Sequence, residues 1–411
     1  MKPGCAAIGM AWLVWIVLAA GMSAEAQVKI GLEVLLEEHL DLIADKRVGL
    51  IGNQTSLDAQ GRHAAERIGA HARITALFGP EHGFRGNVED GVTIDASKWK
   101  NIPIFSLYGE YREPTPAMLK NVDVLIYDIQ DVGVKFYTFI SNLFLAMCAA
   151  KRDGIPVIVL DRPDPITAAM VDGAVTNPAH AGFVGVIPLP IRYGMTVGEL
   201  ARLFNEEKYA GFSIGADLTV IPMKNYGRTT WYDECGLPWI APSPNMTTLE
   251  TAMIYPGTCL VEGTNLSEGR GTDAPFLTLG APFIEAQKWL EALPEAVRKG
   301  VRVEFVDFKP RSIPGMVSKP KYENETCHGL RIHIEDRSVF HPIDFAVALL
   351  SAAQKLYPEK FQTRRYLDQL WGNEDLRAMI AEGADYHTIL RTTESGVKQF
   401  SEVRQKYLMY P

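Results

Sequence analysis

Unbroken apolar runs recur along the first half of the chain, separated by segments with helical patterning. The runs read as strands at 47–52, 74–78, 122–128 and 155–160, and the segments between them as helices at 63–72 and 137–152. A strand that is apolar on both faces must be covered by helices on both faces, as in a mostly parallel sheet. The sequence therefore predicts an α/β fold with a Rossmann-like N-terminal domain.

The predicted order of helices and strands changes after about residue 276. A helix is expected near 283–293, strands near 301–308 and 330–334, and further helices from residue 342 onward. With 411 residues and 47% hydrophobic content, the chain is long enough to bury two cores. We therefore expect a smaller α+β domain at the C-terminus.

The N-terminus has the pattern of a secretory signal. Lys2 precedes an uncharged apolar stretch at 6–20, and Ala24-Glu25-Ala26 forms a small-residue cleavage site before Gln27. We expect residues 1–26 to be a signal peptide, the protein to be exported to the periplasm or the exterior, and no stable membrane insertion after cleavage. An uncleaved membrane anchor is the competing interpretation, because the apolar stretch is near the lower length limit for a spanning helix.

The net charge and the spacing of the cysteines and histidines argue against two classes of protein, those that bind nucleic acid and those that hold a metal or cofactor. A formal net charge of −8 argues against nucleic acid as a partner, because neutralising phosphates takes an excess of Lys and Arg. No CxxC pair or histidine pair with zinc spacing is present, so no metal or cofactor is expected. Export would allow disulfides, and three complete pairings of Cys148, Cys235, Cys259 and Cys327 are open.

The loop at 78–86 concentrates groups that can do chemistry. It brings Glu81, His82 and Arg85 together between glycines, directly after a predicted strand. Active sites of open α/β sheets lie beyond the carboxyl ends of their strands. Glu81 is therefore a candidate acid, and the alternative is an exposed ion pair of Glu81 with Arg85.

Polar residues also follow the other predicted strands. They include Asn53 after the first strand, Asp128, Gln130 and Asp131 after the third, and Asp161 and Arg162 after the fourth. In a parallel sheet these ends converge on one crevice.

The stretch at 225–275 is rich in Pro, Gly and Asn, and so long an irregular segment in a compact protein is usually functional or disordered. Its glycines can expose backbone amides, and Arg270 offers a planar fork suited to a carboxylate or phosphate. We expect an anion-recognising wall here, and the alternative is a set of solvated loop charges. The polar residues concerned are Asn245, Glu262, Asn265, Glu268 and Arg270.

Several of these motifs together resemble the NamZ-type exo-β-N-acetylmuramidases. The segments are 78–86, 128–133 with 136–138, 161–163, 194–196 with 198–200, 242–246 and 262–272. The resemblance runs in order from about residue 29 to residue 410. One departure is Tyr193, where many relatives are expected to have histidine.

The resemblance implies a glycoside hydrolase that removes N-acetylmuramic acid from the non-reducing end of peptidoglycan fragments. It also implies a catalytic domain, assigned to 27–258, and a C-terminal auxiliary domain, assigned to 259–411, that completes the cleft. Glu81 maps onto the family's candidate catalytic acid. The alternatives are a non-catalytic periplasmic protein that binds sugars or muropeptides, and a metal-dependent hydrolase of another cell-wall bond.

Glycosidic hydrolysis usually needs a second carboxylate opposite the acid. Asp128, Asp131, Asp161 and Glu262 are all open for this role, as is the 2-acetamido group of the substrate. The predicted catalytic set is Glu81, His82, Asp128 and Asp131. The predicted substrate-binding set is Asn53, Arg85, Gln130, Tyr137, Asp161, Arg162, Asn245, Glu262, Asn265, Glu268 and Arg270.

Arg85 is expected to face the lactyl carboxylate of the substrate, with Arg270 as its competitor. The stereochemical course, the glycan length, the tolerance for attached peptide and the oligomeric state are left open by the sequence.

Overall fold

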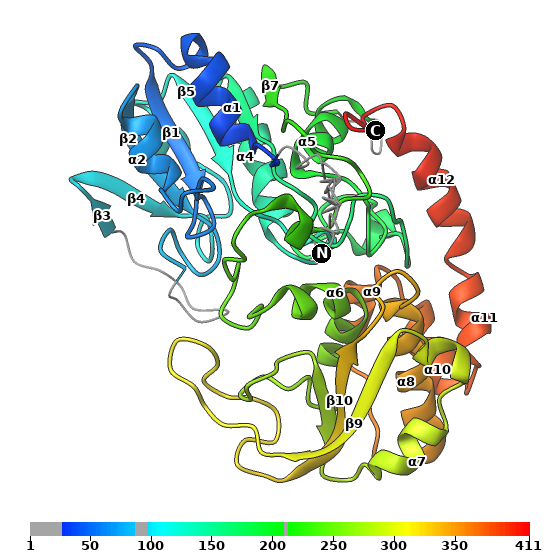
Figure 1. Ribbon diagram of the computed structural model, residues 1–411. Coiled ribbons are helices and arrows are strands. Elements are labelled where there is room, and N and C mark those ends of the chain that lie inside the picture. Colours follow the sequence, from blue (N-terminus) through cyan, green and yellow to red (C-terminus); the bar gives the residue numbers. More distant parts are fainter. Residues whose placement is uncertain (1–26, 87–96, 209–212) are drawn as a thin grey trace, which may run out of the picture.

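The computed structural model describes residues 27–86, 97–208 and 213–411, so the predicted signal peptide at 1–26 lies outside the described residues. The described chain forms two lobes (Figure 1). We call the lobe built on the larger sheet the N-lobe and the lobe built on the smaller sheet the C-lobe.

The N-lobe sheet has seven strands in the order β3-β4-β2-β1-β5-β6-β7. All neighbouring pairs are parallel except β3 with β4. The strands span Arg47–Gly52 (β1), Arg73–Gly79 (β2), Ser97–Trp99 (β3), Ile102–Ser106 (β4), Val124–Asp128 (β5), Val157–Leu160 (β6) and Leu218–Ile221 (β7). The predicted mostly parallel sheet is confirmed, while the edge strand β3 and its neighbour β4 were not predicted.

Helices cover both faces of this sheet. On one face, Leu50 of β1 packs in a cluster with α1 (Gly31–Glu38) and α2 (Ala64–Gly69). On the other face, the next residue, Ile51, packs in a cluster with α3 (Pro116–Leu119), α4 (Phe139–Asp153) and α5 (Val197–Glu206). Successive strand residues point to opposite faces, which explains why the runs are apolar throughout.

The C-lobe is built on a three-stranded antiparallel sheet in the order β8-β10-β9. The strands span Thr278–Ala281 (β8), Val301–Phe308 (β9) and Cys327–Ile334 (β10). The helices are α6 (Leu249–Thr258), α7 (Ala286–Glu291), α8 (Pro342–Leu356), α9 (Tyr366–Trp371), α10 (Asp375–Ala381) and α11 (Tyr386–Arg391). The predicted fold class is confirmed, and the division at 258/259 stays a prediction.

Helix α6 lies within the stretch that the sequence presents as irregular. It contains Pro256 and crosses α8 closely at Gly257, where an added Cβ would lie 1.8 Å from the carbonyl oxygen of Pro342. Only glycine permits this approach of the two backbones.

The C-terminal helix α12 (Glu394–Arg404) runs from the C-lobe back to the N-lobe (Figure 1). Beyond it, the Met409 amide donates to Glu199 Oε1 at 2.7 Å, and the Tyr410 hydroxyl donates to Asp161. Glu199 also forms a capping box with Thr196 at the start of α5. The C-terminal segment therefore ties the two lobes together.

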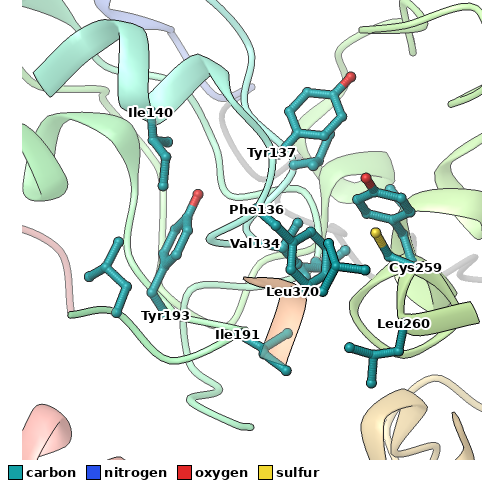
Figure 2. Close-up of a cluster of buried hydrophobic side chains, with 14 of the residues drawn as sticks. Val134, Phe136, Tyr137, Ile140, Ile191, Tyr193, Cys259, Leu260 and Leu370 are labelled. Atoms are coloured by element: carbon teal, nitrogen blue, oxygen red, sulfur yellow. The ribbon is translucent and has the colours of Figure 1, made fainter. Parts of the chain in front are cut away.

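The lobes also share one buried apolar core (Figure 2). In it, Phe136 and Ile140 of the N-lobe lie in the same cluster as Leu260 and Leu370.

The cysteines Cys148, Cys235, Cys259 and Cys327 are all free thiols. Within the described part of the chain, no helix has the length and apolarity needed to cross a membrane.

Candidate active site

A cavity of about 760 Å³ lies between the two lobes. Its N-lobe lining comes from Glu81, His82, Tyr108, Arg112, 136–139 and 179–184. The rest comes from Ser243, Met246, Tyr255, Glu262, Arg270, Phe276, Tyr366 and Gln369. Many of these side chains are aromatic rings interspersed with a few charged groups, which is the usual make-up of a small-molecule site. The inter-lobe cavity is therefore the candidate active site.

Glu81 reaches this cavity from the loop that follows β2. The loop turns through left-handed backbone at His82 (φ 68°) and Gly83 (φ 78°), and the Gly83 amide donates to the Pro80 carbonyl at 2.9 Å. The hydroxyl of Thr138, the residue before α4, donates to Glu81 Oε2 at 3.2 Å. Glu81 is half-buried on the cavity wall, and His82 beside it is buried and also lines the cavity.

Four residues of alternating charge, Glu262, Arg270, Glu268 and Lys321, form a network in the C-lobe. Arg270 donates to Glu262 Oε1 from Nε at 3.0 Å and from Nη2 at 2.8 Å. Its Nε also lies 3.8 Å from Glu268 Oε1, and Lys321 Nζ lies 3.0 Å from Glu268 Oε2. Of these four residues, Glu262 and Arg270 line the cavity, and Glu268 and Lys321 do not.

Burial raises the pKa of Glu262, and the charge of Glu268 adds to the effect. Arg270 and Lys321 oppose it, because nearby cations favour the ionised carboxylate. Among the described residues, Glu81 and Glu262 are the carboxylates that line the cavity. They come from different lobes, so the site is complete only when the lobes are together.

Asp128 and Arg162 lie outside the cavity lining, which differs from the expected convergence of strand ends. Arg162 donates to both oxygens of Asp128, at 2.6 and 3.0 Å, and both side chains are buried. Arg162 Nη2 also donates to the Leu57 carbonyl at 3.1 Å. The pair therefore joins the ends of β5 and β6 outside the lining of the inter-lobe cavity.

Asp131 and Asp161 are also buried away from the cavity lining. Asp131 accepts from the Tyr193 hydroxyl and from the Gly133 amide, and burial raises its pKa to about 8. Asp161 accepts from Thr196 Oγ1 at 2.8 Å, from the Gly198 amide at 2.7 Å and from Tyr410. Burial raises the pKa of Asp161 to about 7.

Four of the predicted substrate-binding residues instead make hydrogen bonds between their side chains and backbone groups of nearby segments. The side chains of Asn53, Gln130, Asn245 and Asn265 bond respectively to the Thr55 amide, Pro163 O, Met316 O and Lys360 O. None of the four belongs to the cavity lining. Arg85 is exposed and lines a separate hollow of about 510 Å³ beside Trp99. Arg85 therefore does not face the inter-lobe cavity.

Of the predicted set, the cavity brings together Glu81, His82, Tyr137, Glu262 and Arg270. Sequence reasoning did not assign roles to Tyr108, Arg112, Thr138, Phe183 or Tyr366. Thr138 carried a signal, because it ends the motif at 136–138. The others stand on segments without a readable pattern. No group of three or more His, Cys, Asp or Glu suited to a metal ion occurs within 27–86, 97–208 and 213–411.

Comparison with known proteins identifies the family. Residues 48–250 match the N-terminal model of the exo-beta-N-acetylmuramidase NamZ family, and residues 253–410 match its C-terminal model. The chain is 40% identical over 390 residues, 93% of its length, to the peptidoglycan beta-N-acetylmuramidase NamZ of Bacillus subtilis, of which 92% is covered.

Two solved structures share the fold. Both are DUF1343 family proteins of Bacteroides fragilis, with TM-scores of 0.84 and 0.76 and identities of 31% and 32%. Each match covers 94% of this chain and 99% of the other. The chain thus belongs to the NamZ exo-β-N-acetylmuramidase family and is a glycoside hydrolase, which confirms the resemblance of its motifs.

Proposed function

We propose that this enzyme releases N-acetylmuramic acid from the non-reducing end of peptidoglycan fragments. The observation that carries the proposal is the pair Glu81 and Glu262, which line one cavity from opposite lobes. Glycosidic hydrolysis uses such a pair of carboxyl groups on the two sides of the scissile bond. The Bacillus subtilis relative, named a peptidoglycan β-N-acetylmuramidase, supports the choice of substrate.

In this mechanism Glu81 is the general acid. Its carboxyl group gives a proton to the glycosidic oxygen as the bond from this oxygen to the anomeric carbon breaks. The rest of the glycan, which is the leaving group, therefore departs as a neutral alcohol. The Thr138 hydroxyl, 3.2 Å from Glu81 Oε2, fixes the orientation of the carboxyl group on the cavity wall. The aromatic lining supplies apolar faces against which sugar rings can pack.

Glu262 is the opposing carboxylate. Arg270 donates two hydrogen bonds to Glu262 Oε1 and so fixes the orientation of the Glu262 side chain. The carboxylate faces the positive charge that develops at the anomeric carbon, and it acts either on that carbon or on a water molecule. The substrate's acetamido group is the other nucleophile available. The anomer formed first, read by NMR, distinguishes retention from inversion.

The test is digestion of a β-linked N-acetylmuramoyl–N-acetylglucosamine disaccharide, with products identified by mass spectrometry. The wild type should release both monosaccharides, and Glu81→Gln should release neither while still folding. Glu285→Gln is the matched control, because Glu285 forms an exposed ion pair with Lys288 outside the cavity. Binding of the disaccharide without any product from the wild type would contradict the proposal and favour ligand capture.

We also propose that the protein is exported, and the support for export comes from the sequence alone. Residues 1–26 carry the apolar stretch and the Ala24-Glu25-Ala26 site. Sequencing the N-terminus of the protein recovered from its native cells should give Gln27 as the first residue. An intact N-terminus on the mature protein would contradict cleavage.

A further inference from the structure

Helix α4 supports one wall of the inter-lobe cavity through two adjacent buried residues. Ser141 Oγ donates to the Phe183 carbonyl at 2.7 Å. Asn142 Nδ2 donates to the carbonyls of Leu107 at 3.0 Å and Arg112 at 3.3 Å. Both Ser141 and Asn142 are fully buried, so the loops that carry Phe183 and Arg112 are fixed to the same rigid helix.

On this wall the guanidinium of Arg112 is held above an aromatic ring. Its Cζ lies 4.7 Å from the centroid of the Phe183 ring, and the Tyr108 ring lies 6.3 Å from Phe183 on centroids. All three residues line the cavity. Stacking on an aromatic face orients the planar guanidinium while leaving its N–H groups at the edge available to hydrogen-bond.

The two arginines of the cavity lining differ in how their charge is balanced. Arg270 is paired with Glu262 and lies near Glu268. Arg112 is exposed and makes no ion pair with any residue that the structure describes. An unbalanced guanidinium at the lining of a sugar-sized cavity favours an anionic ligand group, and its fork of donors fits a carboxylate.

We propose that Arg112 binds a carboxylate of the muramyl ligand and thereby selects muramic acid over glucosamine. The inference rests on the proposed function for the nature of the ligand. N-acetylmuramic acid differs from N-acetylglucosamine by a lactyl ether that ends in a carboxylate. A fragment that still carries peptide has that carboxylate in amide linkage and presents peptide carboxylates in its place. Both sources share the chemistry that Arg112 recognises.

The experiment is calorimetric binding of three ligands that the enzyme does not cleave: N-acetylmuramic acid, N-acetylglucosamine and muramyl dipeptide. Arg112→Gln should weaken binding of N-acetylmuramic acid by about 10- to 100-fold, as expected for loss of a charge-assisted hydrogen bond. It should leave N-acetylglucosamine binding unchanged. Arg112→Lys, which keeps the charge and loses the fork, should bind with intermediate affinity.

Arg337→Gln is the matched control for the calorimetry. Arg337 also stacks on an aromatic ring, with its Cζ 4.6 Å from the Trp231 ring, but it lies outside the cavity lining. Its substitution should not change the affinity for any of the three ligands.

The three ligands distinguish the two possible sources of the carboxylate. They also show whether the Arg112 proposal or the proposed function fails. Loss confined to N-acetylmuramic acid assigns the lactyl carboxylate, and loss confined to muramyl dipeptide assigns a peptide carboxylate. Wild-type affinity of Arg112→Gln for both acids overturns the proposal, as does equal weakening of acids and N-acetylglucosamine, or a wild type that binds neither acid. A wild type that binds the acids but cleaves no disaccharide contradicts the proposed function instead.

Discussion

The carboxylates of the cavity and those of the strand ends behave differently, although the sequence presents them alike. Glu81 and Glu262 line the inter-lobe cavity. Asp128 and Asp161 are fully buried. Asp128 is paired with Arg162, and Asp161 accepts hydrogen bonds from Thr196, Gly198 and Tyr410. A buried carboxylate must be paired, hydrogen-bonded or protonated, so these aspartates are used to hold the fold together.

The difference comes from where the backbone leaves the sheet. Asp128 is the last residue of β5 and Asp161 directly follows β6, so both side chains remain within the layer covered by helices. Glu81 lies two residues beyond β2, on a turn through left-handed backbone at His82 and Gly83. After β2, this two-residue extension and turn carry the Glu81 side chain to the cavity wall.

Replacing the second cavity carboxylate should have the largest effect. Glu262→Gln keeps the shape and an acceptor for Arg270, and removes the charge opposite Glu81. We expect the turnover number to fall by about 10²- to 10⁴-fold, the range for loss of a group that acts in the transition state. Steady-state kinetics on a chromogenic muramide measure this. Turnover within a few-fold of the wild type would remove Glu262 from the mechanism.

Replacing a strand-end carboxylate should instead affect stability. Asp128→Asn leaves Arg162 buried without a counter-charge, which should lower the free energy of unfolding by about 3–5 kcal/mol. Turnover per folded molecule should stay near that of the wild type.

The control is Asp123→Asn, because Asp123 makes a similar two-oxygen pair with Arg47 that is partly exposed. It should cost about 1 kcal/mol or less. Denaturant unfolding measures both variants, and equal losses would contradict the distinction between buried and exposed pairs.

Asp131 should make stability depend on pH. Burial raises its pKa to about 8 in the folded protein, whereas an unfolded aspartate titrates near ~4. Between these values the folded state keeps the proton and the unfolded state releases it, so stability falls as pH rises, by up to about 1.4 kcal/mol per pH unit. Asp131→Asn should flatten this slope between pH 4 and 8. Identical slopes for variant and wild type would contradict it.

The smallest effect is expected at Thr138. Thr138→Val removes the hydroxyl that donates to Glu81, and no helix cap is lost because this side chain makes no capping bond. Loss of one hydrogen bond of about 0.5–1.5 kcal/mol should lower the turnover number by about 2- to 10-fold. Thr138→Ser keeps the hydroxyl and should stay near wild type. Equal kinetics of the valine and serine variants would show that the contact does not orient the acid.

Much of the fold follows from local sequence, because burial on both faces leaves a clear pattern. The strand at 47–52 appears as predicted. Strands β3 and β4 were missed because they are short and lie at or next to the sheet edge, where few of their described residues are buried. Helix α6 was missed because Pro256 and Gly257 are helix breakers in isolation, and tertiary packing on α8 outweighs their propensity.

The site was predictable only where its residues follow a motif. Glu81 and Glu262 stand in segments dense in glycine and charge, and both line the cavity. The reach of Arg162 to Asp128 depends on how β5 and β6 lie side by side, which no local pattern encodes. Tyr366 comes from a helix more than a hundred residues after Glu262 in sequence, and only the packing of the lobes brings it to the cavity.

One side-by-side measurement tests the central claim, that the acid of the loop after β2 does the chemistry and the buried strand-end acids do not. It is the turnover of a chromogenic muramide by Glu81→Gln and Asp128→Asn, each scaled to the folded fraction. Glu81→Gln should lose activity by about 10²-fold or more with wild-type stability, and Asp128→Asn should keep its turnover. Full turnover by Glu81→Gln, or its loss in folded Asp128→Asn, would contradict the account.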